Sequence, residues 1–359
     1  MNGLLLLALS DESPRNLSIF DPVSPPAESI HHLAILVLAI TGGIFLVVES
    51  VLIYSLLRFR SRRSAAVSAA PGGRDARAPE PPQVYGSKPI EIAWTAAPAL
   101  IVFVLTLVVA RTEWEVRIDP NNLPPDLKDS QPLRIRVVGH QWWWEFAYDS
   151  YGDVKLGFVA ANELHVPASN RSVPSERRPV FLTLQSVDVA HSFWVPRLAG
   201  KTDLIPGRTN TMWFETEYTG LFVGQCAEYC GTQHANMLLR VYVDSAEEFA
   251  RWMESQKKNG LDNNDAEVRK GKEVFLAQSC INCHRVSGTP ARGTFGPDLT
   301  HLMSRDTLAA GMVPNDREGK KLREWIADPQ TIKPGCLMPA FGLSESDLGR
   351  VVRYLRSLE

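Results

Sequence analysis

The chain has 359 residues, and at roughly 100 to 200 residues per domain this length predicts two or three structural units. Its 38 Lys and Arg residues nearly balance its 40 Asp and Glu residues, and no basic stripe indicates nucleic-acid binding. All five cysteines lie in the second half, and four of them fall in two metal-binding patterns. No disulfide framework is therefore predicted.

Two long apolar runs, 33–57 and 92–110, stand near the N-terminus. Each is long enough to cross a hydrocarbon core of about 30 Å as a helix, so residues 31–110 are predicted to form two transmembrane helices. The loop 58–89 between them is rich in Arg and Lys, which favours the cytoplasmic side. Residues 1–30 are then extracytoplasmic, and the apolar run 4–9 is either a remnant of a secretory signal or a tail on the membrane surface.

After a Pro-rich and Asn-rich stretch, 119–132, the pattern changes to short runs with alternating apolar residues. Turn residues separate these runs, which is typical of β-strands. The segment 111–250 is therefore predicted to be a small β-sandwich or barrel. The predicted strands are 133–138, 180–184, 211–218 and 238–243.

The sequence CAEYCGTQHANM, from Cys226 to Met237, has the spacing C-x3-C-x3-H-x2-M. Thiolate, imidazole and thioether ligands together select copper, and two cysteines four residues apart can bridge a pair of metal ions. A pair of coppers would need a second imidazole, for which His191 is the best candidate. The alternatives His140 and His165 are interpreted as hydrogen-bonded residues of the sheet.

The sequence Cys280-Ile-Asn-Cys283-His284 has the C-x-x-C-H pattern that attaches a c-type haem. The two cysteines reach the two vinyl groups, and the histidine is the fixed axial ligand of the iron. This attachment takes place outside the cytoplasm of a bacterium. The metal-binding domains are therefore expected on the periplasmic or outer side of the bacterial cytoplasmic membrane, in agreement with the charge of the loop.

A sixth iron ligand is expected from one of three downstream methionines, Met303, Met312 and Met338. Met338 is preferred because it lies in a Pro-rich and Gly-containing loop, and methionine ligation raises the haem potential. Cys336 in the same loop is a rival ligand, although a small thiol packed beneath the haem is the preferred interpretation.

Helical periodicity over 266–278, 320–327 and 344–358 predicts an all-α domain at 265–359. Three helices around a covalently attached haem describe a class I cytochrome c. The polar segment 251–264 is predicted to be a helix tail and a linker. Residues 111–264 carry 16 basic and 20 acidic side chains, and residues 265–359 carry 14 and 12. This difference either helps the two regions dock or arises by chance.

The run HSFWVP, which starts at His191, and the run CAEYCGTQHANM together resemble subunit II of haem-copper cytochrome c oxidases. The appended C-x-x-C-H domain is similar to the fused-cytochrome, caa3-type branch. The resemblance covers nearly the whole chain and implies a cupredoxin-like β-domain. It also implies a dinuclear copper centre with the backbone carbonyl of Glu228 and five side chains as ligands: His191, Cys226, Cys230, His234 and Met237.

The same resemblance makes the side chain of Glu228 a candidate ligand of magnesium at the junction with subunit I. It also implies that Trp142 lies at the surface where electrons enter, with Trp143 as a second candidate. Trp144 is expected in the core. Asp188, three residues before His191, is either a hydrogen-bond partner of His191 or a surface turn residue.

Glu91, with Trp94, Thr95 and Pro98, matches the family pattern at the start of the second span. In the family this glutamate lies at the mouth of a proton pathway. The alternative is a charged residue that only marks the start of a helix.

The resemblance implies an electron relay. A donor, either a cytochrome c or a quinol–cytochrome c reductase-type complex, would reduce the covalent haem, and the electron would pass through the copper centre to subunit I. There oxygen is reduced to water and protons are pumped. The expected partners are subunit I, other oxidase subunits and membrane lipid. The alternatives are a copper-containing small subunit of a nitric oxide reductase and a free-standing membrane-anchored electron carrier.

Overall fold

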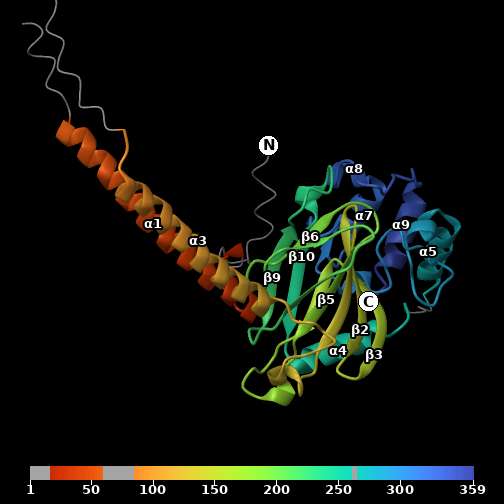
Figure 1. Cartoon of the computed structure of the whole chain (residues 1–359). Coiled ribbons are helices and arrows are strands. Elements are labelled where there is room, and N and C mark those ends of the chain that lie inside the picture. The colour runs from red at the N-terminus through yellow and green to blue at the C-terminus, as the bar shows by residue number, and fades with distance from the viewer. Residues whose placement is uncertain (1–16, 60–84, 261–264) are drawn as a thin grey trace, which may run out of the picture. The chain divides into compact units, whose positions relative to one another are not determined.

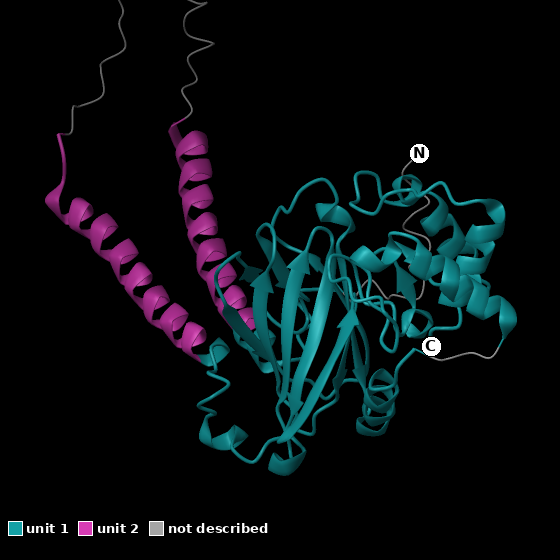
Figure 2. Cartoon of the chain, turned by 90° about the vertical axis from the view of Figure 1, so that its right-hand side faces the viewer, with its two compact units in different colours: residues 1–29, 115–359 teal, residues 30–114 magenta. Residues whose placement is uncertain are grey.

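The computed structural model describes residues 17–59, 85–260 and 265–359, which fall into two compact units (Figure 2). One unit comprises residues 30–114, and the other combines the residues up to 29 with residues 115–359. The apolar run 4–9 and most of the predicted cytoplasmic loop 58–89 lie outside the described residues, as does the end of the predicted linker.

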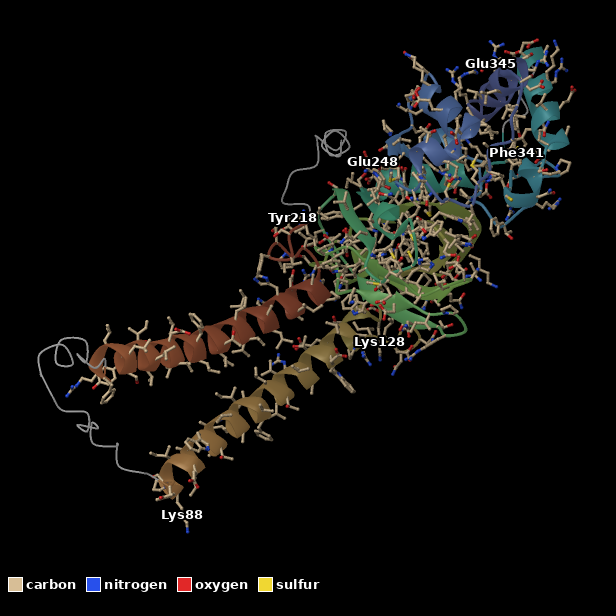
Figure 3. All side chains as sticks on the ribbon, turned by 90° about the horizontal axis from the view of Figure 1, so that it is seen from above. Lys88, Lys128, Tyr218, Glu248, Phe341 and Glu345 are labelled. Atoms are coloured by element: carbon tan, nitrogen blue, oxygen red, sulfur yellow. The ribbon has the colours of Figure 1, made fainter. Side chains whose placement is uncertain are left out.

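Two long helices occupy the N-terminal part of the chain, α1 at Pro25–Phe59 and α3 at Lys88–Val116 (Figure 1). By length and composition, both could cross a membrane. Figure 3 shows side chains projecting from all sides of both helices, and none of the α3 side chains is buried. Apolar side chains around a helix with internally paired backbone groups suit a lipid environment.

Both helices continue beyond the predicted spans, 33–57 and 92–110. Hydropathy locates only the apolar part of a helix, whereas charged residues at its ends remain compatible with helical hydrogen bonding. The start of α3 has its own cap, because the Ser87 amide donates to Glu91 Oε1 at 3.2 Å. The Glu91 amide in turn donates to the Ser87 carbonyl at 2.9 Å.

The β-domain consists of two five-stranded sheets. The first has the order β3-β2-β1-β5-β8, with strands β1 Leu133–His140, β2 Trp143–Tyr151, β3 Val154–Ala161, β5 Val180–Ser186 and β8 Asn210–Phe214. The second has the order β4-β10-β9-β6-β7, with strands β4 Glu163–Pro167, β6 His191–Trp194, β7 Thr202–Leu204, β9 Gly220–Cys226 and β10 Leu238–Asp244.

Alternation of buried and exposed residues along these strands builds a single core. In β10 the pattern is strict, since Leu239, Val241 and Val243 are buried while their neighbours are half-buried. Trp144 and Phe193, one from each sheet, are almost fully buried and meet edge to face with ring centroids 6.0 Å apart. The predicted cupredoxin-like sandwich is confirmed.

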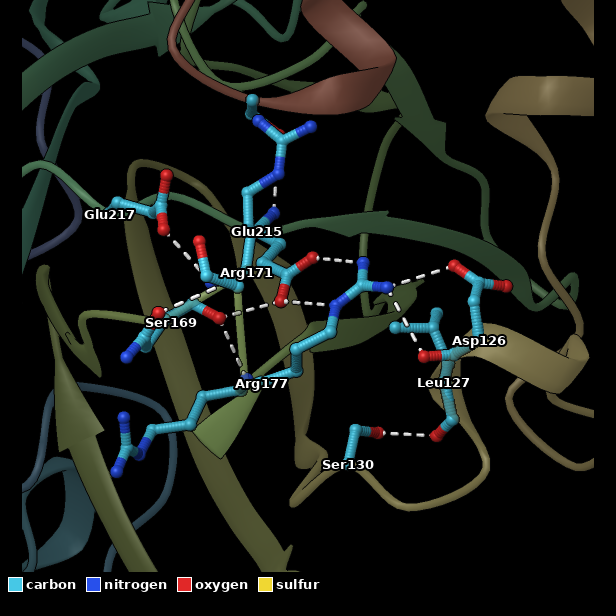
Figure 4. A network of polar contacts seen from close by, with 12 residues as sticks. Asp126, Leu127, Ser130, Ser169, Arg171, Arg177, Glu215 and Glu217 are labelled. Atoms are coloured by element: carbon cyan, nitrogen blue, oxygen red, sulfur yellow. Dashed lines mark hydrogen bonds and ion pairs between the residues drawn. The ribbon is translucent and has the colours of Figure 1, made fainter. Parts of the chain in front are cut away.

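The predicted strand 211–218 is shorter in the structure, because β8 ends at Phe214. The next residue, Glu215, is fully buried and binds Arg177 instead of continuing the sheet (Figure 4). Its carboxylate accepts from Arg177 Nη2 at 2.5 Å and Nε at 3.1 Å, and from Ser169 Oγ at 2.6 Å. Arg177 Nη1 also donates to Asp126 at 2.8 Å. This forked contact ties the segment after β8 to the segment before β5.

We expect Arg177→Met to lower the free energy of unfolding of the β-domain by about 3–5 kcal/mol, because it leaves the Glu215 carboxylate buried without a counter-charge. Arg171→Met is the matched control. Its ion pair with Glu28 joins side chains that are 36% and 38% exposed, so its loss should cost about 0–1 kcal/mol. Denaturant unfolding of the full chain in detergent compares the two variants, and equal losses would contradict the prediction.

Helix α4, Ala246–Gln256, follows β10 and begins with a capping box formed by Ser245 and Glu248. It crosses the predicted boundary at 250, because its apolar face packs on the sandwich. Trp252 stacks on His165 with ring centroids 4.5 Å apart, and Met253 is buried. Residues 251–256 therefore form the helix tail that was predicted at the start of the segment 251–264.

The C-terminal segment is helical, as predicted, and forms its own apolar core. Helices α5 and α9 pack against each other, and Gly271 of α5 makes this possible because a Cβ there would lie 2.1 Å from the Arg350 carbonyl oxygen. The helices are α5 Ala266–Ala277, α6 Cys280–Cys283, α7 Lys320–Ala327, α8 Pro329–Ile332 and α9 Glu345–Leu355. A two-stranded ladder, β11 Thr307–Leu308 and β12 Val313–Pro314, completes the segment.

Candidate metal and haem sites

One end of the second sheet brings the copper-type residues together. Strand β9 ends at Cys226, and the loop to β10 carries the other residues of the motif. Strand β6 pairs with β9 in a register that sets Phe193 opposite Cys226, so His191 at the start of β6 reaches the same end. The Cys226 amide donates to the Met237 carbonyl at 3.0 Å, which closes the loop.

The side chains of this loop converge on two sulfur atoms. Cys226 Sγ lies 3.8 Å from Cys230 Sγ, 4.0 Å from His191 Nδ1 and 3.2 Å from the Glu228 carbonyl oxygen. Cys230 Sγ lies 3.7 Å from His234 Nδ1 and 3.9 Å from Met237 Sδ. Two sulfurs, each with its own imidazole and one weaker donor, form a paired set of soft ligands that fits two copper ions.

The electrostatics of the cluster favour a thiolate at Cys226. The side-chain contact with Cys230, although burial opposes it, holds the pKa of Cys226 well below its usual range, and the same contact raises the pKa of Cys230. Both cysteines are 2% exposed. A buried thiolate is ready to bind a metal ion, since the thiolate is the form that coordinates.

Asp188 orients one of the imidazoles. Its Oδ1 lies 2.9 Å from His191 Nε2, which leaves Nδ1 directed at Cys226. The Gln141 and Val189 amides donate to the same carboxylate at 2.6 and 2.7 Å. Burial opposes these bonds, but together they lower the pKa of Asp188. Of the two interpretations of Asp188, the hydrogen-bond partner of His191 is therefore the one observed.

We expect Asp188→Asn to weaken copper binding roughly 10- to 100-fold, the usual cost of losing such an outer partner of a metal-binding histidine. Asp149→Asn is the control, because Asp149 forms only an exposed contact of 3.7 Å with Arg136. Copper retention under titration with a chelator measures the effect. Equal retention in the two variants would show that Asp188 does not tune the site.

The alternative histidines lie elsewhere. His140 stacks on Trp143 with ring centroids 4.0 Å apart, and His165 Nδ1 lies 2.8 Å from Asp244 Oδ2. His165 has the hydrogen-bonding role predicted for it, whereas His140 packs on Trp143 and its buried Nε2 has no hydrogen-bond partner among the described residues.

The aromatic run differs from the prediction in one respect. Trp144 is fully buried in the core, as expected, but Trp142 is only 9% exposed and Trp143 only 7%. The expectation that Trp142 lies at the surface is wrong for this chain, because the C-terminal segment covers it. Its indole Nε1 donates to the Cys230 carbonyl at 2.9 Å, so the ring contacts the copper-type loop directly.

The haem motif opens into an apolar cavity of the C-terminal segment. Cys280, Cys283 and His284 line this cavity, together with Met338. His284 Nδ1 donates to the Pro297 carbonyl at 2.8 Å, which leaves Nε2 free to bind iron. A Cβ on Gly296 would lie 2.6 Å from His284 Cε1, so only glycine fits beside the ring. Burial lowers the pKa of His284, which favours the neutral, metal-binding imidazole.

Of the three candidate methionines, Met338 alone lines this cavity. Met303 is buried in the apolar core of the segment, and its amide donates to the Leu358 carbonyl at 2.8 Å. Cys336 also lines the cavity, where burial raises its pKa and keeps it a thiol. The residues present therefore fit a covalently attached haem with a His and Met ligand set.

Copper-domain residues complete the wall of the same cavity. Gln141, Trp142, Trp143 and Asn162 line it beside the haem motif. Sequence reasoning missed Lys333, which is 2% exposed and contacts both domains. The only signal for it was its place in the Pro-Gly loop that leads to Met338.

Three known protein families match successive parts of the chain. Residues 12–110 match cytochrome C oxidase subunit II, transmembrane domain, and residues 133–244 match cytochrome C oxidase subunit II, periplasmic domain. Residues 268–359 match cytochrome c. Cytochrome c oxidase subunit 2 of Alkalihalophilus pseudofirmus is 33% identical over 346 residues, which cover 96% of this chain and 91% of that protein.

The chain belongs to the cytochrome c oxidase subunit II family. It carries a cytochrome c domain fused at its C-terminus. Cytochrome c oxidase subunit 2 of Bacillus subtilis is 29% identical over 368 residues, covering 99% of this chain and 96% of that protein. The solved periplasmic domain of subunit II of cytochrome oxidase of Bradyrhizobium japonicum is 33% identical, covers 35% of this chain and 93% of that chain, and has a TM-score of 0.31.

As a subunit II with a fused cytochrome c domain, the protein is the electron-input part of an oxidase whose oxygen-reducing site lies in subunit I. It is a membrane-anchored protein with an extracellular domain and works with other oxidase subunits. Its copper domain binds copper, and its cytochrome c domain binds haem c.

Proposed function

We propose that this subunit II takes electrons from an external donor at its cytochrome c domain and passes them through its copper domain to subunit I, where oxygen reduction is coupled to proton pumping. The observation that carries the proposal is the single wall shared by the two sites. Trp142 lines the haem cavity, and its indole donates to the carbonyl of Cys230. Electron transfer between the sites therefore needs no diffusion of a carrier.

The proposed copper ligands are the backbone carbonyl of Glu228 and the side chains of His191, Cys226, Cys230, His234 and Met237. Their support is the convergence on two sulfurs within 4.0 Å and the orientation of His191 by Asp188. When bound by these residues, a pair of copper ions would share one transferred electron, so that little bond-length change would accompany its arrival or departure. The protein holds the ligands rigid: His191 and Met237 are both fully buried.

The proposed haem ligands are His284 and Met338, with Cys280 and Cys283 as the attachment points. Their support is the common cavity and the fixed orientation of the His284 ring. Because Trp142 is covered, a donor meets the cytochrome c domain first. Donors of two kinds fit, a soluble cytochrome c or a quinol–cytochrome c reductase-type complex.

Two glutamates are proposed to act at the border with subunit I. Glu91 lies in the first turn of α3, where its carboxylate accepts from the Ser87 amide, and a carboxylate there suits the mouth of a proton pathway. Glu228 directs its carbonyl at Cys226 while its side chain is half-exposed. That carboxylate is proposed as a ligand of magnesium between the subunits, since carboxylate oxygen is what this ion prefers.

We propose the bacterial cytoplasmic membrane as the location, with α1 and α3 spanning it among lipid and the loop 58–89 on the cytoplasmic side. The proposed domains are the membrane anchor at 31–110, the copper domain at 111–250 and the cytochrome c domain at 265–359, with residues 1–30 outside. The proposed linker at 251–264 includes the end of α4.

Purification of the complex from its own membrane in detergent tests the function. We expect subunit I to co-purify, with two coppers and one covalent haem per subunit II, and with oxygen uptake that depends on reduced donor. Nitric oxide consumption without oxygen uptake would select a nitric oxide reductase instead. Purification of the chain alone would select a free-standing carrier.

A further inference from the structure

A buried ammonium joins the cytochrome c domain to the copper domain. Lys333 Nζ donates to the carbonyl oxygens of Trp142 at 2.9 Å, Asn236 at 2.9 Å and Ala309 at 3.0 Å. Trp142 and Asn236 belong to the copper domain, whereas Ala309 belongs to the cytochrome c domain. An ammonium group has three N–H donors, and all three are used here.

The three carbonyls that accept from Lys333 lie close to the proposed copper and haem ligands. Asn236 lies between the proposed ligands His234 and Met237, and Trp142 is the residue whose indole contacts Cys230. Lys333 itself begins the loop that carries Met338. One side chain thus holds together the Met338 loop, Trp142 and the copper-ligand loop.

Burying this charge is costly. Among the residues that the structure describes, no carboxylate forms an ion pair with Lys333, and burial lowers its pKa to about 7. A buried Lys without a counter-ion is rare unless its hydrogen bonds hold it in place. The contacts of Lys333 therefore favour a role in positioning the two domains over a role in stabilising the fold.

Further contacts surround Lys333 on the same face. The Leu238 amide donates to the Ala310 carbonyl at 3.2 Å, and Gln233 Nε2 donates to the Pro334 carbonyl. The buried carboxylate of Glu163, in the copper domain, accepts from the Asp306 and Thr307 amides of the cytochrome c domain at 3.0 and 2.8 Å. These contacts also hold the two domains together.

We propose that Lys333 is a positioning residue that fixes the Met338 loop against Trp142 and the copper-ligand loop, and so sets the distance between the haem and copper sites. The part of this inference that concerns electron transfer rests on the proposed function. The part that concerns domain docking does not.

The test uses Lys333→Met in the full chain within the purified complex, because methionine keeps the length of the side chain and removes the charge. Lys333→Gln keeps two N–H donors and is the milder variant. Lys320→Met, at a lysine whose side chain is 76% exposed, is the control. Hydrogen exchange of the Leu238 amide reports docking, and the rate of electron transfer from the reduced cytochrome c domain to the copper domain reports distance.

We expect Leu238 to exchange at least about tenfold faster in Lys333→Met and by an intermediate factor in Lys333→Gln, with no change in Lys320→Met. Electron transfer should slow in the same order, while copper and haem contents stay at wild-type levels. Exchange and transfer rates within twofold of wild type in both Lys333 variants would overturn the proposal. Failure of both variants to bind copper or haem would also overturn it, because it would make Lys333 a folding residue.

The two kinds of failure are distinguishable. If the wild-type complex takes up no oxygen but Leu238 exchange still follows the order of the variants, the proposed function fails and the docking role of Lys333 stands.

Discussion

Replacement of Cys230 by serine is expected to remove the dinuclear copper centre and to abolish electron delivery to subunit I. Cys230 Sγ lies within 3.9 Å of Cys226 Sγ, His234 Nδ1 and Met237 Sδ, so it is the central atom of the cluster. A serine hydroxyl stays protonated and is a hard, weak ligand for copper. Loss of a side chain that only hydrogen-bonds to a metal ligand costs roughly 10- to 100-fold in metal affinity. Loss of the Cys230 thiolate, which binds the metal itself, should therefore cost more than about 100-fold.

Copper analysis of the purified complex, together with oxygen uptake, measures the effect. We expect at most one copper per chain in Cys230→Ser and less than about 1% of wild-type turnover, with unchanged covalent haem. Cys336→Ser is the matched control, since Cys336 is a thiol that lines the haem cavity and lies outside the copper cluster. Two coppers retained in Cys230→Ser would refute the ligand assignment.

The second large effect is expected for Met338→Leu. The leucine keeps the volume of the loop but removes the thioether that faces the haem cavity, and covalent attachment through Cys280 and Cys283 remains. Methionine ligation raises the haem potential, so the variant should have a lower potential by on the order of 0.1 V, within the roughly 0.8 V range that axial ligands span. At about 59 mV per tenfold change, this corresponds to about 50-fold in the equilibrium of a one-electron step.

Potentiometric titration followed by haem absorbance checks this result. Met303→Leu is the control, because Met303 is equally part of the cytochrome c domain but is buried in its apolar core. If Met303→Leu changed the potential and Met338→Leu did not, the assignment of the sixth ligand would have to be reversed. The copper content should be the same in both variants.

Local sequence was enough to predict the helices and strands whose pattern of apolar residues lies within a single short segment. The alternation in 238–243 predicted β10, and the helical periodicity of 266–278 and 320–327 predicted α5 and α7 almost to the residue. Predictions were less accurate where distant contacts decide where an element ends. The strand at 211–218 stops at Phe214 because Glu215 pairs with Arg177.

The candidate site shows the same division. The pattern C-x3-C-x3-H-x2-M placed four soft ligands in one loop, and the need for a second imidazole added His191 from another strand. The register of β6 on β9 explains how His191 reaches the loop. Whether Asp188 is a surface residue or a partner of His191 depends on how the chain folds, and the distance of 2.9 Å decides it.

The sequence by itself determined the two cofactor types, the helical anchor and the order of the domains, because each depends on ligand spacing or on local periodicity. Only the tertiary structure decided which methionine faces the haem cavity and that Trp142 is covered. It alone also showed that Lys333 joins the two domains. The Lys333 contacts join residues about 100 to 190 positions apart, and no local pattern encodes such contacts.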